Sequence, residues 1–394
     1  MRLRNLAVLC GFLAVAACHA KFYVITQLAP GADAKAVASS FGLTLIDTTE
    51  GAPFALMEAA TESIAESAES RMENDARVVW AEDDESLSGP SGQRKGSTLP
   101  AVGDRVSEQI ANRSALGQIG WNSSLSKMPG RSVRVALLDS GISPLAPALW
   151  SKVVANANFV ELGRRAYDLP TKTDSDGDGI ADGLVGHGTM VAGVVDQVSP
   201  QSVFVVARIS DSDGNSTTWR LIKGIAFAAV NGAELANVSL GTLSEIPAMS
   251  DILEWASSKN LTVVAAIGNN GISQACYPAR IKRTICVGGL TSTNVKAPFS
   301  NWDSMCKASA PSVGICSTDW TGLMSYWSGT SFSTPMVTGA LAEMLRQNRT
   351  ILSSDKLANA LKLSVVDITK QNPVYKSKLG GLLNVAKLVS LAKK

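Results

Sequence analysis

The chain has 394 residues, 45% of them hydrophobic and 18% charged, so it is long and apolar enough to form two domains with separate cores. The net charge of +2 is unevenly spread: residues 21–90 hold 13 acidic and 4 basic side chains, whereas residues 91–394 carry a net charge of +9. The basic residues form no cluster interleaved with aromatic ones, which argues against nucleic-acid binding.

The N-terminus has the layout of an export signal. Arg2 and Arg4 precede an apolar run, Leu6–Ala17, that is too short to span a bilayer and is followed by small residues. Val15-Ala16-Ala17-Cys18 also resembles a bacterial lipobox, in which the cysteine is lipidated; ordinary cleavage after residue 17 or 20 is the alternative. We therefore expect residues 1–20 to be a signal peptide and the protein to be secreted or to lie in the periplasm or cell envelope. Membrane attachment is expected only if Cys18 is lipidated.

Residues 21–87 predict a small α+β domain. Alternating apolar residues and amphipathic stretches indicate strands at Phe22–Ile25, Leu43–Ile46, Phe54–Met57 and Val78–Ala81, with helices at Asp33–Phe41 and Ser63–Met72. This order is the β-α-β-β-α-β arrangement of ferredoxin-like domains. The acidic charge of this unit favours its docking on the basic remainder, although two unrelated solvated surfaces are the alternative.

The next segment predicts an exposed linker. Residues 86–103 are rich in Ser, Gly, Pro and charged side chains and show no apolar periodicity. We place the linker, with a processing site, at residues 88–113 and a second domain at residues 114–394.

From residue 114 onward, short apolar strands alternate with helices. The strands are predicted at Val133–Leu138, Val203–Ala207, Leu235–Ser239, Val263–Ile267 and Ile285–Val287, and the helices at Val191–Gln197, Trp219–Val230, Met249–Lys259 and Ser333–Arg346. Nearly continuous apolar strands are typical of a parallel sheet covered on both faces. The sequence thus predicts an open, largely parallel α/β sheet, which binds ligands at the carboxyl ends of its strands.

Three polar residues lie at such positions. Asp139 directly follows a predicted strand, His187 begins a helix between two glycines, and Ser331 stands at the start of a long apolar helix. Each alone is as well explained as a helix cap. Together they supply a nucleophile, a general base and an acid that orients the base. His187 is the only histidine beyond the export segment, and an imidazole suits a base acting near neutral pH.

The motifs around these residues identify a family. Asp139-Ser140-Gly141, His187-Gly188-Thr189-Met190-Val191-Ala192-Gly193 and Gly329-Thr330-Ser331-Phe332-Ser333-Thr334-Pro335, in that order, closely resemble those of the subtilisin-like serine peptidases, over residues from about 119 to 389. The resemblance implies that Asp139 orients the base, that His187 acts as base and then acid, and that Ser331 forms an acyl-enzyme. No cofactor is implied for this chemistry.

The resemblance also implies the surroundings of the triad. Asn269 matches the family's oxyanion-hole asparagine, with Asn270 as the alternative donor. Ser239, Leu240 and Gly241 resemble the strand that pairs with a peptide substrate, and Gly268 belongs with them in substrate binding. Residues 21–87 resemble the family's inhibitory propeptide, which implies an autoprocessing zymogen inhibited by its own propeptide, with proteins or peptides as substrates.

Two further groups of residues suggest stabilising sites. Asp174, Asp176, Asp178 and Asp182 alternate with glycines as in loops that bind Ca²⁺, although residue 185 is not the Glu of an EF-hand and a solvated turn is the alternative. Cys276, Cys286, Cys306 and Cys316 of an exported protein favour disulfides. By proximity in the sequence we expect the pairs Cys276–Cys286 and Cys306–Cys316.

Two other functions remain open from the sequence. A subtilase fold without catalysis would serve as a binding module, and the same triad could support an acyl hydrolase or a transpeptidase instead of a peptidase. Covalent labelling of Ser331 separates the first of these from an enzyme, and a comparison of peptide with ester substrates separates the second.

Overall fold

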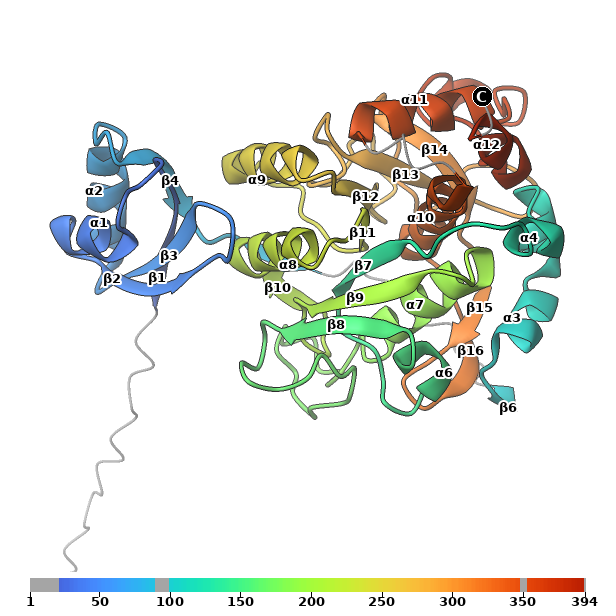
Figure 1. Ribbon diagram of the computed structural model, residues 1–394, viewed down its shortest axis with the longest axis horizontal. Coiled ribbons are helices and arrows are strands. Elements are labelled where there is room, and N and C mark those ends of the chain that lie inside the picture. The colour runs from blue at the N-terminus through green and yellow to red at the C-terminus, as the bar shows by residue number, and fades with distance from the viewer. Residues whose placement is uncertain (1–20, 89–98, 348–352, 393–394) are drawn as a thin grey trace, which may run out of the picture.

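The computed structural model describes residues 21–88, 99–347 and 353–392, which form a small N-terminal domain and a larger α/β domain (Figure 1). The expected signal peptide, Cys18 and residues 89–98 of the expected linker lie outside the described residues. Within the described ranges, no helix is both long and apolar enough to cross a membrane.

The small domain has the predicted β-α-β-β-α-β order. Its elements are β1 (Phe22–Leu28), α1 (Ala34–Ser40), β2 (Thr44–Thr48), β3 (Phe54–Ala59), α2 (Glu62–Met72) and β4 (Val78–Asp83). The strands form an antiparallel sheet in the order β2-β3-β1-β4. Asp33 and Thr61 begin the two helices as N-caps, each accepting a hydrogen bond from the backbone three residues on. The core of this domain is its own, formed by residues such as Val37 and Met57.

The larger domain is built on a seven-stranded sheet in which every neighbouring pair is parallel. The order is β14-β13-β12-β11-β7-β9-β8. The bounds are β7 Arg134–Asp139, β8 Val153–Asn158, β9 Val203–Arg208, β11 Leu235–Val238, β12 Thr262–Ala266, β13 Ile285–Leu290 and β14 Cys306–Pro311. The predicted open parallel sheet is therefore confirmed.

Helices cover both faces of this sheet (Figure 1). One face packs on α7 (His187–Val198) and the long α10 (Thr330–Gln347), the other on α8 (Thr218–Val230) and α9 (Pro247–Ser258). Because α7 and α10 pack against each other, the segments that begin with His187 and with Thr330 lie side by side.

Shorter elements complete the domain. They are β5 (Ser86–Ser88), β6 (Leu99–Val102), α3 (Arg105–Ala111), α4 (Arg113–Gln118), α5 (Ser123–Ser126), α6 (Pro147–Trp150), β10 (Asn215–Thr217), β15 (Ile315–Thr318), β16 (Leu323–Trp327), α11 (Ser354–Ser364), the 3-10 helix η1 (Pro373–Tyr375) and α12 (Val385–Leu391).

The linker predicted at residues 88–113 is not irregular where the structure describes it: Ser88 ends β5, and β6, α3 and the start of α4 lie within those bounds. β5 pairs antiparallel with β10, and β6 pairs with β16. The strand β5 has no sequence periodicity because it is only three residues long. It is stabilised by its partner strand and by the side chain of Leu87, which is buried in the core beneath α8 and α9.

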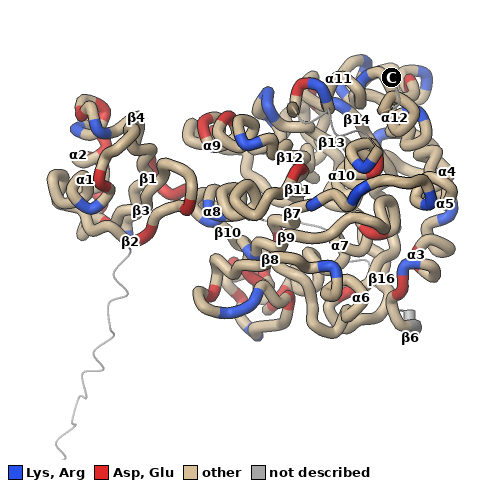
Figure 2. Tube along the Cα trace, viewed as in Figure 1, with Lys and Arg blue, Asp and Glu red and all other residues tan. Residues whose placement is uncertain are grey.

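Carboxylates of the small domain dock on the N-termini of two helices of the large one. Glu82 Oε2 accepts a hydrogen bond from the Ala248 amide at the start of α9 (2.9 Å), and Asp84 Oδ1 accepts one from the Trp219 amide at the start of α8 (2.8 Å). Such N-termini carry unpaired N–H groups and a positive dipole end, which favour a carboxylate. Acidic positions of the small domain lie on the side facing α8 (Figure 2), where Asp47 forms an ion pair with Lys223.

Candidate active site

Asp139 and His187 meet at the carboxyl end of β7. The Asp139 Oδ1 atom lies 2.7 Å from Nδ1 of His187, and both side chains are almost fully buried. The close approach depends on glycine, since a Cβ at Gly188 would lie 2.3 Å from the carbonyl oxygen of Gly141. The first turn of α7 can therefore pack directly on the turn that follows Asp139.

The environment of His187 favours a charged imidazole. Burial lowers the pKa of His187, but the charge and hydrogen bond of Asp139 raise it, as does the charge of Asp168, so the pKa lies above its ordinary value. The rings of Trp327 and Phe332 flank the imidazole at 6.0 and 5.6 Å between centroids. With Nδ1 engaged by Asp139, the buried Nε2 atom has no hydrogen-bond partner and is the nitrogen left for proton transfer.

Ser331 lies in the first turn of α10, one residue from the Phe332 ring that contacts His187. Its Oγ donates to the carbonyl oxygen of Ser239 over 3.4 Å, and the side chain is fully buried. The structure thus joins Asp139 to His187 by a hydrogen bond, while the Ser331 hydroxyl is directed to the end of β11. A hydrogen bond between a nucleophile and its general base, here Ser331 and His187, often tightens only when substrate is bound.

Asn269 lies beside the turn that leads into Ser331. Its Oδ1 accepts hydrogen bonds from the amide and the hydroxyl of Thr330, both at 2.9 Å. These bonds fix the amide plane, and its buried Nδ2 has no partner. A Cβ at Gly329 would lie 3.3 Å from that Nδ2 atom. Asn269 therefore presents an oriented, unused N–H donor next to the Ser331 turn.

The residues expected to bind substrate line one cavity of about 850 Å³. Ser239, Leu240, Gly241, Gly268 and Asn269 are among its walls, and residues 176–184 form another side. The segment that follows the small domain reaches this cavity, since Ser88 at the end of β5 lines it and its carbonyl accepts a hydrogen bond from the Gly241 amide (3.2 Å). A polypeptide strand thus pairs with the segment that the sequence predicted to bind one.

The expected disulfides are wrong. Cys276, Cys286, Cys306 and Cys316 are all buried free thiols. The parallel pairing of β13 with β14 sets Cys286 opposite Cys306 instead of near Cys276. Nearness in the sequence fails as a guide because Cys276 packs beneath Gly268 and Cys316 belongs to another sheet.

Of the four acids predicted as metal ligands, the structure brings only two into one cluster. Asp174 and Asp176 come together with Asp213, with candidate ligand atoms within 4.8 Å of one another. Asp182 accepts hydrogen bonds from Thr171 and Lys172 instead, and Asp178 caps the amide of Ile180. The third member of this cluster, Asp213, was not singled out from the sequence; it lies in a second acidic turn before Gly214, 31 residues from Asp182.

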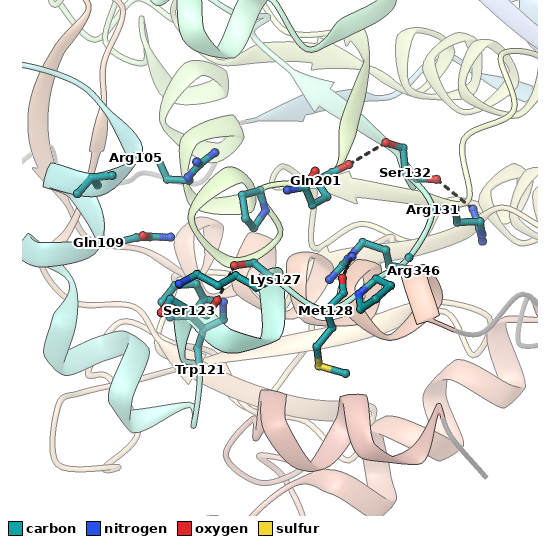
Figure 3. A pocket seen from close by; sticks show the side chains of 15 residues that line it. Arg105, Gln109, Trp121, Ser123, Lys127, Met128, Arg131, Ser132, Gln201 and Arg346 are labelled. Carbon is teal, nitrogen blue, oxygen red and sulfur yellow. Dashed lines mark hydrogen bonds between the residues drawn. The ribbon is translucent and has the colours of Figure 1, made fainter.

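A second cavity, of about 590 Å³, lies between α3, α5 and the end of α10 (Figure 3). Its arginines are engaged in ion pairs: Arg346 with Glu343, Arg131 with Glu234, and Arg105 with Asp196. Arg346 also donates to the carbonyl oxygen of Leu125. These contacts hold surface segments together, and none of the predicted site residues lines the cavity.

Comparison with known proteins agrees with these observations. Residues 130–380 match the profile of the Subtilase family. The chain is 35% identical over 234 residues to Subtilisin amylosacchariticus of Bacillus subtilis subsp. amylosacchariticus, covering 56% of this chain and 57% of that relative. It is 31% identical over 266 residues to Subtilisin BL of Lederbergia lenta, covering 65% and 90%.

Two solved structures share the fold. Fervidolysin from Fervidobacterium pennivorans has a TM-score of 0.73 at 17% identity, covering 94% of this chain and 61% of that one. The epidermin leader peptide processing serine protease of Staphylococcus aureus has a TM-score of 0.72 at 19% identity, covering 95% and 99%. From the match over residues 130–380, the chain belongs to the subtilase family.

Proposed function

We propose that this chain is an exported serine endopeptidase that cleaves peptide bonds through an acyl-enzyme and is synthesised as a zymogen. The observation that carries the proposal is a pair of buried nitrogens without partners, on two residues that contact the neighbours of Ser331: His187 at the Phe332 ring and Asn269 at Thr330. Neither Nε2 of His187 nor Nδ2 of Asn269 has a hydrogen-bond partner. A buried polar atom without a hydrogen-bond partner costs free energy, and a bound substrate would supply the missing partners.

In the proposed reaction, the Ser331 hydroxyl turns from the Ser239 carbonyl toward Nε2 of His187. It gives its proton to that nitrogen as Oγ bonds to the substrate carbonyl carbon. Asn269 Nδ2 donates to the oxyanion so formed, and Asp139 stabilises the imidazolium. The imidazolium then protonates the leaving amine, the C–N bond breaks, and water hydrolyses the ester by the reverse sequence of proton transfers.

The small domain is proposed to be the inhibitor of this site. Two of its carboxylates dock on the N-termini of α8 and α9, which holds β5 against β10. The last residue of β5, Ser88, pairs with Gly241 in the substrate cavity. The Ser88 carbonyl thus occupies the Gly241 amide, a backbone donor for which a paired substrate strand would compete.

A structural Ca²⁺ ion is proposed at the acidic cluster. Carboxylate oxygens are the ligands this hard cation prefers, and Asp174, Asp176 and Asp213 bring three of them within 4.8 Å. The Asp178 amide lowers the pKa of Asp176, but desolvation and the facing carboxylates of Asp213, Asp178 and Asp174 leave it raised. A cation would relieve that repulsion and brace the loop ahead of His187.

Labelling with a fluorophosphonate probe tests the peptidase proposal. The full chain should be labelled at Ser331 and should hydrolyse peptides. Ser331→Ala should lose both properties and keep residues 21–88 attached. Ser333→Ala, in the same helix turn, is the matched control and should stay active. A chain that resists the probe would be a binding module, and one that is labelled yet cleaves only esters would be an acyl hydrolase.

A further inference from the structure

Asp168 is a buried acid next to the candidate triad that the sequence did not single out. It follows β8, and its segment pairs with the turn after Asp139: the Ile142 amide donates to the Ala166 carbonyl (3.0 Å) and the Asp168 amide to the Ile142 carbonyl (3.2 Å). Only 1% of the Asp168 surface is exposed. A carboxylate this deeply buried must accept hydrogen bonds from the protein, and the positions of its donors indicate what it stabilises.

Both carboxylate oxygens of Asp168 bind the first turn of α7, on either side of His187. Oδ1 accepts from the Gly186 amide (2.9 Å), and Oδ2 accepts from the Thr189 amide (3.1 Å) and the Thr189 hydroxyl (2.7 Å). The residue at the N-cap position, Gly186, has no side chain and a φ of +91°. Asp168 therefore acts as the cap that this helix lacks in its own sequence.

Asp168 is also one of two carboxylates whose charge acts on the imidazole. From β7, Asp139 contacts Nδ1 directly, and from the segment after β8, Asp168 acts through the helix turn. No Lys or Arg among the described residues contributes to the pKa shift of His187. The other groups against the ring are the uncharged Trp327 and Phe332. Burial raises the pKa of Asp168 itself to about 6, so this acid is ionised at and above neutral pH.

We propose that Asp168 is a positioning residue of the active site, which fixes the turn that carries His187 and supplies a second negative charge that stabilises the imidazolium. The proposal rests on the proposed function, because it concerns the base of that reaction. It assigns no contact with substrate, and Asp168 does not line the substrate cavity.

The test is an NMR titration of the His187 ring in the full chain carrying Ser331→Ala, which prevents self-digestion. The chain has two histidines, so His19→Gln leaves His187 as the single reporter. In Asp168→Asn, which is isosteric but neutral, His187 should protonate at lower pH than in the parent. Thr189→Val is the matched control: it removes the hydroxyl that bonds Asp168 and accepts from the Ser143 amide, but it keeps the Asp168 charge, and His187 should titrate as in the parent.

Kinetics with Ser331 intact give an independent readout. Asp168→Asn should lower kcat roughly 10- to 100-fold through a displaced and less stabilised imidazolium. KM should stay near that of the parent, and the acidic limb of the rate profile should move to lower pH. A role in folding alone would reduce the fraction of active enzyme without moving that limb.

Two results would overturn the proposal: an unchanged His187 titration in Asp168→Asn, or an equal displacement in Thr189→Val. If Asp168→Asn does not fold, Asp139→Asn decides. In Asp139→Asn, Asp168 is the remaining carboxylate whose charge acts on the imidazole, so His187 should still become protonated within the titration range. An imidazole that stays neutral over the whole range would show that the Asp168 charge does not stabilise the imidazolium. The titration needs no catalysis, so it can fail or succeed independently of labelling at Ser331.

Discussion

The two polar atoms of the Asn269 side-chain amide have different roles: one holds the turn and the other is a free donor. Oδ1 is fixed by Thr330, and Nδ2 is left unpaired beside the Ser331 turn. Asn269→Ala should therefore lower kcat with little change in KM, because the oxyanion exists only after attack. The expected loss is roughly 10²–10³-fold, the range known for such a donor in subtilisins themselves.

Asn270→Ala is the control for this prediction, since Asn270 is the neighbouring amide and lines the same cavity. It should keep most of the activity. Steady-state kinetics on a peptide substrate measure both variants, and a larger loss at position 270 would assign the oxyanion donor to that residue.

At the residue scale, the sequence predicts groups whose type is unusual and fails for groups whose role is set by tertiary contacts. His187 stands out as the single histidine beyond residue 20, and glycines frame it on both sides. Asp168 is one of many acids, and its role depends on a bridge to Ile142 that brings it to α7. The cysteine pairing fails for the same reason, because the register of β13 and β14 is not encoded in the spacing of the cysteines.

At the scale of elements, the loop that leads into α7 is held by carboxylates with two different roles. Asp182 accepts hydrogen bonds from the amides of Thr171 and Lys172. Asp174, Asp176 and Asp213 also accept backbone amides, but in addition their carboxylates face one another. Ca²⁺ should bind the second group and raise the melting temperature of the Ser331→Ala chain. At a hundredfold excess over Kd the added stability is about 2.7 kcal/mol.

Asp176→Asn should abolish the Ca²⁺-dependent rise in melting temperature, and Asp178→Asn, two residues along the same exposed loop, should retain it. Thermal unfolding in Ca²⁺ and in a chelator measures the difference. Equal melting temperatures in the two conditions for the parent chain would show that the acidic turn is only solvated.

At the scale of the whole molecule, the periodic segments of both domains are predicted well and their junction is not. Buried parallel strands and amphipathic helices can be recognised in the sequence because each must bury apolar surface, and this requirement fixes the spacing of their apolar residues. β5 is too short to show a pattern, and the docking of Glu82 and Asp84 on two helix N-termini depends on charges that are ordinary in the sequence. The charge asymmetry of the two parts indicates docking but not its geometry.

The junction should also make the association of the two domains depend on pH. Burial raises the pKa of Glu82 to about 7 and that of Asp84 to about 6. Once the domains separate, both return toward ordinary values near 4. The docked state therefore holds protons that the separated state releases, so docking is strongest at low pH and weakens as the pH rises through 6 to 7.

This dependence can be measured in the Ser331→Ala chain with a site for a sequence-specific protease inserted between Pro90 and Ser91. After the cut, the small domain should co-elute with the large one at pH 5.5 and separate from it increasingly toward pH 8. Glu82→Gln retains an acceptor for the Ala248 amide but cannot ionise, so it should flatten the dependence. Glu62→Gln, on the exposed start of α2, should leave it unchanged. Association that strengthens with rising pH would mean that ionised carboxylates at the helix N-termini, and not their desolvation, govern how the small domain is held.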